Sequence, residues 1–260
     1  MNSSHFSKLA IVAVLLAVVA VGPAAAIDVS ASDVPATAEV NSTVDVTYTF
    51  EELYTNYDQW RLTGETQLQS VTWTVTTYDV GETQLNQKQY NAQTFSHQIA
   101  KRDDVAMVTV RLQGTVPEWS EWSYDPPQTL TLATFSETQP GGAKNVLQTS
   151  NLRPYTADSQ AARTAIDRAQ AAIDDAESAG VNVQEAKSFL ENAISAFDNG
   201  NFANAKDLAA DARKTAESAM QSNQRKSTLL MIGGGVLALA ILAGLVYWYL
   251  SNRETYDKLG

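Results

Sequence analysis

Strict alternation marks the stretch Thr43-Val44-Asp45-Val46-Thr47-Tyr48-Thr49-Phe50, in which every second residue is apolar. A period of two predicts a β-strand with one buried face. The same pattern returns several times before residue 155, at Val71 to Val75, Val108 to Leu112, Leu130 to Phe135 and more weakly Tyr90 to Ile99, with an edge strand at Ala36 to Val40. Six or seven short strands without an intervening helix predict an antiparallel β-sandwich over residues 27–155.

Two features of this region resemble the immunoglobulin type of sandwich. Trp73, in a central strand, is similar to the core tryptophan of such domains, and Asp104 to Val110 resembles their penultimate strand. The chain has no cysteine, so the usual disulfide beside that tryptophan is missing. The resemblance implies an Ig-like architecture, and a different two-sheet topology would fit the same pattern.

Composition changes after Arg153-Pro154-Tyr155. Residues 156–227 contain no proline, alanine dominates, and apolar residues recur every three or four positions. This spacing predicts helices. The first begins near Asp158 or Ser159 and ends at Gly180, the second covers Gln184 to Asp198, and the third begins near Phe202. An antiparallel three-helix bundle that serves as a stalk is the expected arrangement.

Two uninterrupted apolar runs predict the location. Residues 1–26 combine a run of about 14 apolar residues with an Ala24-Ala25-Ala26 ending, typical of a cleaved signal peptide. Residues 228–250 contain no charge and are long enough, at about 34 Å of helix, to span a bilayer. Residues 27–227 are then extracellular and 251–260 form a cytoplasmic tail. Small residues Gly233 to Gly235 and Gly244 would allow homo-oligomerisation through the span.

Charge and residue types exclude several classes of function. Residues 27–227 carry 27 acidic and 15 basic side chains, and this negative excess disfavours nucleic acid as a partner. Without cysteine there are no thiolate metal sites or thiol nucleophiles. His97 is the one histidine of the mature chain, and its strand position beside Phe95 and Ile99 favours a structural role. No catalytic or metal residue and no cofactor is predicted; a glycan hydrolase with paired carboxylates is the enzyme alternative.

The composition and layout resemble those of membrane-anchored surface proteins of haloarchaea. The chain is acidic, lacks cysteine, uses Lys and Arg equally, and combines a signal peptide, sandwich, helical stalk, single span and short tail. It lacks the Pro-Gly-Phe tripeptide and Thr-rich linker of their processed glycoproteins. The resemblance implies a protein adapted to high salt, which screens repulsion between carboxylates.

Two segments contain candidate site residues. Asn41-Ser42-Thr43 is a glycosylation sequon expected in a turn between strands. Residues 117–127 form a proline-bracketed loop in which Trp119, Trp122 and Tyr124 alternate with carboxylates, a composition suited to stacking on a sugar or gripping a peptide. The competing interpretation is that the two tryptophans fold back over the open end of the sandwich. Trp60, in a loop predicted over residues 54–67, either joins this group or lies in the core.

The sequence therefore predicts a non-catalytic, single-pass protein of the cell membrane with extracellular N-terminal domains. In the first hypothesis, its aromatic loop binds envelope glycan or another surface protein. In the alternative, the chain is a structural or accessory subunit whose helical bundle and span assemble with another membrane protein.

Overall fold

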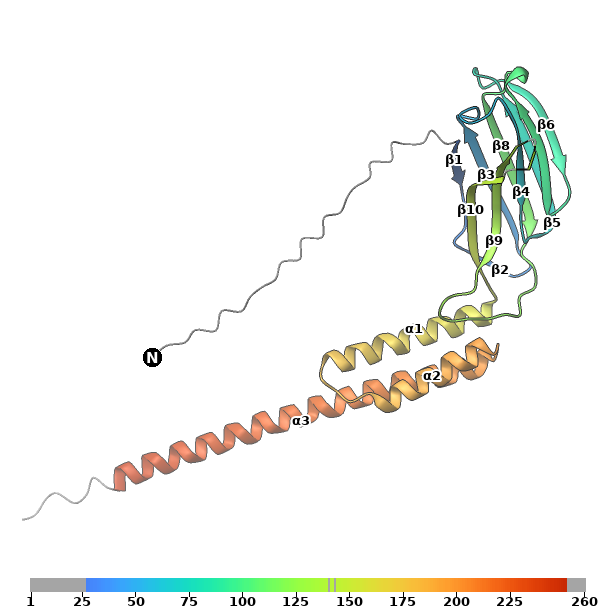
Figure 1. The fold of residues 1–260 in the computed structure, drawn as a ribbon. Coiled ribbons are helices and arrows are strands. Elements are labelled where there is room, and N and C mark those ends of the chain that lie inside the picture. The colour runs from blue at the N-terminus through green and yellow to red at the C-terminus, as the bar shows by residue number, and fades with distance from the viewer. Residues whose placement is uncertain (1–26, 140, 143, 252–260) are drawn as a thin grey trace, which may run out of the picture.

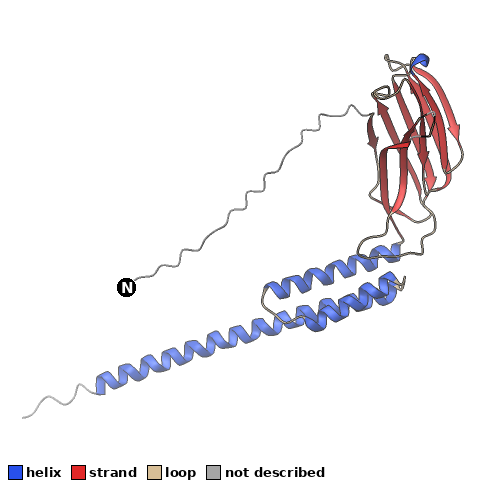
Figure 2. Ribbon diagram, viewed as in Figure 1, coloured by secondary structure: helices blue, strands red, loops and turns tan. Residues whose placement is uncertain are grey.

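A computed structural model describes residues 27–139, 141–142 and 144–251; the side chains of 224–240 and 250–251 lie outside the described set, as do the predicted signal peptide and most of the tail. The chain is β in its first part and α in its second (Figures 1 and 2). The strands are β1 Asp28–Ser32, β2 Thr37–Glu39, β3 Thr43–Glu51, β4 Gln59–Glu65, β5 Gln69–Tyr78, β6 Gln84–Tyr90, β7 Thr94–Ala100, β8 Met107–Thr115, β9 Leu130–Thr138 and β10 Lys144–Tyr155. The helices are the short η1 Lys101–Asp103, α1 Ala157–Ser178, α2 Gln184–Asp198 and α3 Phe202–Ser251.

Two five-stranded sheets form the first part. One has the order β1-β3-β8-β5-β6 and the other β2-β10-β9-β4-β7. Neighbouring strands are antiparallel except β2, which pairs in parallel with the end of β10. β8 is followed by two further strands, so the expected likeness of residues 104–110 to a penultimate strand is wrong; β9 holds that place. The prediction of a two-sheet β region followed by helices is confirmed.

The core lies between the sheets and is centred on Phe135. Its ring lies 4.6 Å from Tyr48, 5.0 Å from Phe50 and 5.8 Å from Trp73 in tilted or edge-on geometry. Val44, Val46, Tyr48 and Phe50, the alternating set of β3, are all buried. Gly64 is required on β4, because a Cβ there would lie 2.2 Å from a ring carbon of Phe95.

Two parts of the β region differ from the sequence-based prediction. The loop predicted over residues 54–67 contains β4, and Trp60 lies fully buried within it, its indole Nε1 donating to the carbonyl of Leu53 at 2.8 Å. The strand predicted over residues 90–99 is β7 preceded by a turn: Tyr90 is the last residue of β6, the chain turns at residues 91–93, and β7 lies in the other sheet.

The sandwich passes into the helical part through a single residue. β10 continues to Tyr155, paired with β9 and β2, and α1 begins at Ala157. Thr156 caps the helix: its hydroxyl accepts from the Ser159 amide at 3.1 Å, and the Ser159 hydroxyl accepts from the Thr156 amide at 2.8 Å. This reciprocal capping box fixes the start of α1 directly after the end of β10.

The helices share one hydrophobic core. Alanines of α1, α2 and α3 are buried beside a few larger residues: Ile166, Ile173, Leu190 and Phe197. Gly180 and Gly200, both with positive φ, end the turns after α1 and α2. α3 continues as one helix to Ser251 (Figure 1).

The predicted span of residues 228–250 falls largely on side chains outside the described set. Among the residues that are described, no helix offers an apolar stretch of sufficient length to cross a membrane.

Candidate binding site

The aromatic loop between β8 and β9 reaches from the sandwich towards the helices (Figure 1). Trp119 packs partly buried against the sandwich core, and its indole Nε1 donates to the carbonyl of Glu121 at 2.6 Å. A small hollow of about 180 Å³ lies beside it, lined by Glu118, Trp119, Ser120 and Glu121. Of the three predicted binding residues, Trp119 is therefore the one associated with the sandwich.

Trp122 and Tyr124 pack instead against the helical core. The Trp122 ring meets Phe202 edge-on with centroids 5.0 Å apart, and the Tyr124 ring meets Phe197 at 6.0 Å. The tryptophans thus fold back as the competing interpretation expected, but Trp122 covers the α2–α3 turn rather than the end of the sandwich. Trp122 and Tyr124 are both partly buried by these contacts.

Polar contacts fasten the same loop to the helices. The Arg163 guanidinium of α1 donates through Nη2 to the carbonyls of Ser123 at 3.0 Å and Tyr124 at 2.7 Å, and lies 4.5 Å from the Tyr124 ring centroid. The Tyr124 hydroxyl donates to the Asp167 carboxylate at 2.6 Å, and the Tyr124 backbone amide donates to the Asp198 carboxylate at 2.7 Å. We call Trp122, Tyr124, Arg163, Asp167 and Asp198 the clasp.

Tyr124 keeps its proton at physiological pH. Burial, together with the hydrogen bond to Asp167, raises the pKa of Tyr124 well above its ordinary value. The phenol therefore remains a donor to the carboxylate. Sequence reasoning missed Arg163, Asp167 and Asp198, because on a helix such charges are typical of a solvated face and carry no local signal of a distant partner.

Asn41 lies exposed in the turn between β2 and β3, with φ of 65°. The backbone N–H of Asn41 donates to the carbonyl of Val116 at 2.9 Å. The position is the exposed turn that the sequon required. Glycosylation itself stays a prediction.

His97 has a structural environment. Its Nδ1 lies 2.9 Å from the Tyr90 hydroxyl across the edge between the sheets. Burial, and secondarily the charge of Lys88, lowers the pKa of His97, so the imidazole is held neutral. Within the described residues no three His, Asp or Glu side chains gather closely enough to hold a metal ion.

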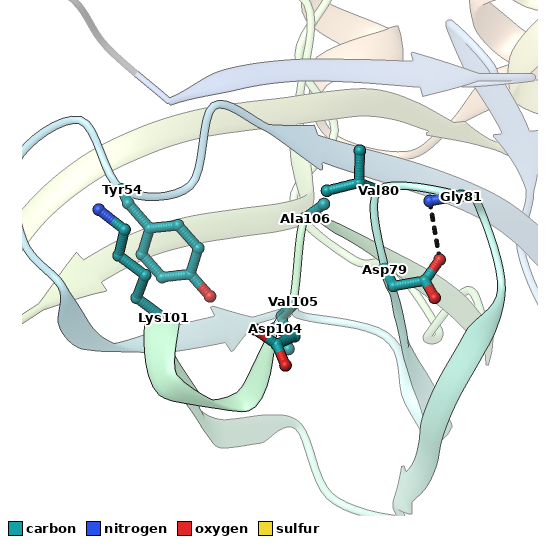
Figure 3. Close-up of a pocket in the computed structure, with 8 residues that line it drawn as sticks. All are labelled: Tyr54, Asp79, Val80, Gly81, Lys101, Asp104, Val105 and Ala106. Atoms are coloured by element: carbon teal, nitrogen blue, oxygen red, sulfur yellow. Dashed lines mark hydrogen bonds between the residues drawn. The ribbon is translucent and has the colours of Figure 1, made fainter.

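A second candidate site lies at the sandwich end remote from the helices, which we call the distal pocket. Three loops form it, with Tyr54 from the β3–β4 loop, Asp79, Val80 and Gly81 from the β5–β6 turn, and Lys101, Asp104, Val105 and Ala106 from the β7–β8 connection (Figure 3). Its volume is about 460 Å³. This is within the range of small-molecule sites.

Comparison with known proteins identifies no family. No family model and no curated protein matches the sequence. Among solved structures, AvmM, which catalyses macrocyclization in alchivemycin A biosynthesis, is 12% identical over 50% of this chain and 89% of its own, with a TM-score of 0.31. BcpA, the major pilin subunit of Bacillus cereus, is 12% identical over 49% of this chain and 39% of its own, with a TM-score of 0.32. A DUF4466 family protein from Parabacteroides merdae is 13% identical over 50% of this chain and 46% of its own, with a TM-score of 0.31.

Proposed function

We propose that the chain is a non-catalytic, single-pass cell-surface protein that presents its β-sandwich on a helical stalk for binding envelope glycan or protein. The observation that carries this proposal is the clasp. It joins the loop before β9 to α1 and the α2–α3 turn, while Thr156 joins β10 directly to α1. Two separate attachments between the same two units resist bending, because one must break before the other can pivot.

The continuity of α3 also supports the proposal. The helix that packs against α1 and α2 near Ala205 and Ala209 is the same helix that ends at Ser251. Its described C-terminal residues expose apolar surface, with Leu245 57%, Tyr247 76% and Trp248 63% exposed. Exposed tyrosine and tryptophan beside aliphatic residues are typical of the interface between lipid and water. An anchored helix of this kind would hold the sandwich at a constant orientation to the membrane.

The acidic surface supports an extracellular setting in high salt. Most ion pairs in the described residues are on the surface, for example Lys101 with Asp58 at 3.5 Å and Arg213 with Glu217 at 3.4 Å. Such exposed pairs contribute little to stability, and strong salt screens them further. The sandwich therefore depends on its apolar core, which high salt does not weaken.

Protease treatment of intact cells tests the location. With a tag after Gly260, external protease should remove residues 27–227 and leave the tagged tail protected, and N-terminal sequencing should begin at Ile27. Replacing residues 228–250 by a polar linker should release the protein into the medium. A mature chain beginning at Met1, or a tail digested while the sandwich survives, would overturn the proposal.

A groove between α2 and α3 favours the alternative of an accessory subunit. It has a volume of about 550 Å³ and is lined by side chains that include Phe189, Lys214 and Ser222. Crosslinking in intact cells separates the two functions. Loss of partners after Phe189→Ser or replacement of the span, but not after changes in the sandwich, would favour assembly with another membrane protein.

A further inference from the structure

The distal pocket is built on loops that are tied to one another. The Asp79 carboxylate accepts from the amides of Gly81 and Thr83 through Oδ1, both at 2.8 Å, and holds the β5–β6 turn. The Ala106 amide donates to the Tyr78 carbonyl at 2.8 Å, and the Lys101 amide donates to the Asp58 carbonyl at 2.8 Å. All three loops are thereby joined by backbone hydrogen bonds. A preformed pocket loses little conformational entropy when it takes a ligand.

The chemistry of the lining is half apolar and half polar. The Tyr54 ring, Val105 and Ala106 supply an apolar wall, and Val80 projects from the rim with 91% of its surface exposed. The polar part of the lining consists of two hydrogen-bond acceptors, Asp79 and Asp104, and one donor, Lys101 (Figure 3). Within the described chain, Oδ2 of Asp79 makes no hydrogen bond, since both bonds to that carboxylate use Oδ1.

The Tyr54 hydroxyl is one of four buried side-chain polar atoms without a hydrogen-bond partner among the described residues, and of these four residues only Tyr54 lines the distal pocket. It is buried and has no hydrogen-bond partner in the described residues, a costly arrangement in a folded protein. In Figure 3 it points towards the segment of Asp104 and Val105 that borders the pocket. Burial, with the charges of Asp103 and Asp104, raises the pKa of Tyr54 to about 12, so the phenol keeps its proton. The Tyr54 hydroxyl is thus a hydrogen-bond donor without an acceptor among the described residues.

We propose that the distal pocket binds a neutral saccharide residue. Sugar rings combine apolar C–H faces with hydroxyl groups that donate to carboxylates, and they match a lining of one aromatic ring, aliphatic side chains and carboxylates. Two aspartates against one lysine give the lining a net negative charge, and this repels phosphate, sulfate and uronic acids. A wholly apolar ligand would take the two carboxylates out of water without offering them a donor. The inference rests on the proposed binding function and moves the ligand site from the aromatic loop to the opposite end of the sandwich.

Saturation-transfer NMR on the full chain in nanodiscs tests this inference. The probes are the methyl glycosides of glucose, galactose, mannose and N-acetylglucosamine, each at about 10 mM to suit millimolar affinity, with methyl glucuronide as the anionic comparison. We expect transfer to at least one neutral glycoside and none to the glucuronide. Asp104→Asn keeps a residue that tolerates its positive φ and should weaken binding several-fold, because a carboxylate acceptor is lost.

Val80→Ala has a matched control in Val146→Ala, since both valines are exposed and only Val80 borders the pocket. Val80→Ala should weaken binding about threefold, and Val146→Ala should leave it unchanged. Absence of transfer to every neutral glycoside, equal loss of binding in both valine variants, or preferential binding of the glucuronide would each overturn the inference. Protease treatment of cells is independent of this result, so a surface location without glycoside binding would leave the proposed function standing.

Discussion

Arg163 shows how one side chain can join two units whose contact has no local sequence signal. Its guanidinium donates to two loop carbonyls and faces the rings of Tyr124 and Phe197 at 4.5 and 5.4 Å. Arg163→Met keeps the apolar stem but removes both hydrogen bonds, and we expect a loss of about 2 to 3 kcal/mol at the contact. Hydrogen exchange should become faster in residues 117–129 while the strands stay protected. Arg168→Met, on the exposed side of α1, is the control, and equal exchange in both variants would contradict the role of Arg163.

His97 predicts a pH dependence of stability. Its pKa in the folded state lies below the ordinary value of 6.5, because burial and Lys88 oppose protonation. Below pH 6.5 the unfolded chain therefore takes up a proton that the folded chain resists, and stability falls as the pH decreases from 6.5 towards the folded pKa. Urea unfolding of wild type and His97→Gln at pH 7.5 and pH 5.5 should show a smaller decrease in the variant. A decrease of the same size in both proteins would show that His97 does not contribute and that other groups determine how the free energy of unfolding depends on pH.

At the scale of single elements, the start of α1 shows why the two units are close. Thr156 is both the residue after β10 and the cap of the helix. Thr156→Ala should cost about 1 kcal/mol, because the Ser159 amide loses its acceptor. Thr164→Ala, which removes a hydroxyl bonded to the Gln160 carbonyl within the same helix, should have a smaller effect. Chemical denaturation of both variants measures the two losses in the free energy of unfolding. Equal losses would mean that the Thr156 cap contributes no more than an ordinary helix hydroxyl.

The edge strand β6 carries a charge on its inner face. Lys88 pairs with Val75, which is buried, so both side chains belong to the inner face, and Lys88 lies 5.1 Å from the Tyr90 ring. An inward-pointing charge at an open edge opposes pairing with a second sheet. Lys88→Val should therefore cause self-association that increases with concentration, measured by light scattering after size exclusion. Gln89→Val, on the outer face, is the matched change. Equal self-association of both variants would indicate a non-specific effect of added apolar surface instead.

For the whole molecule, charge predicts a response to salt. The excess of 12 negative charges on residues 27–227 is largely on the surface, and its repulsion is weakened by counterions. We expect the melting temperature of the full chain in nanodiscs to be higher in molar potassium chloride than in about 50 mM, where the Debye length is above 10 Å. An equal or lower value in high salt would count against adaptation to a saline habitat. Potassium glutamate at the same ionic strength distinguishes screening from an effect of chloride.

Short-range patterns in the sequence were sufficient for the elements. The alternation from Thr43 to Phe50 predicted β3, and the spacing of apolar residues predicted α2 at Gln184–Asp198, because periods of two and of 3.6 report which face of an element is buried. Residues 59–65 alternate as well, but a loop was predicted there and the structure has β4 instead. Glycine is typical of turns, and the reason for Gly64 in a strand is the Phe95 ring, which occupies the space that a side chain would need.

Only the tertiary structure decided how the candidate sites are built. The Tyr124 amide and its acceptor Asp198 are 74 positions apart, and the distal pocket joins three loops from residues 54 to 106. No periodicity relates such positions, because their contact depends on how the sheets cross and how α1 leaves β10. Trp122 and Tyr124 therefore read as a free binding surface in the sequence and lie against the helices in the fold. The sequence alone determined which residues are apolar, aromatic or charged, and packing determined which of them were left facing solvent.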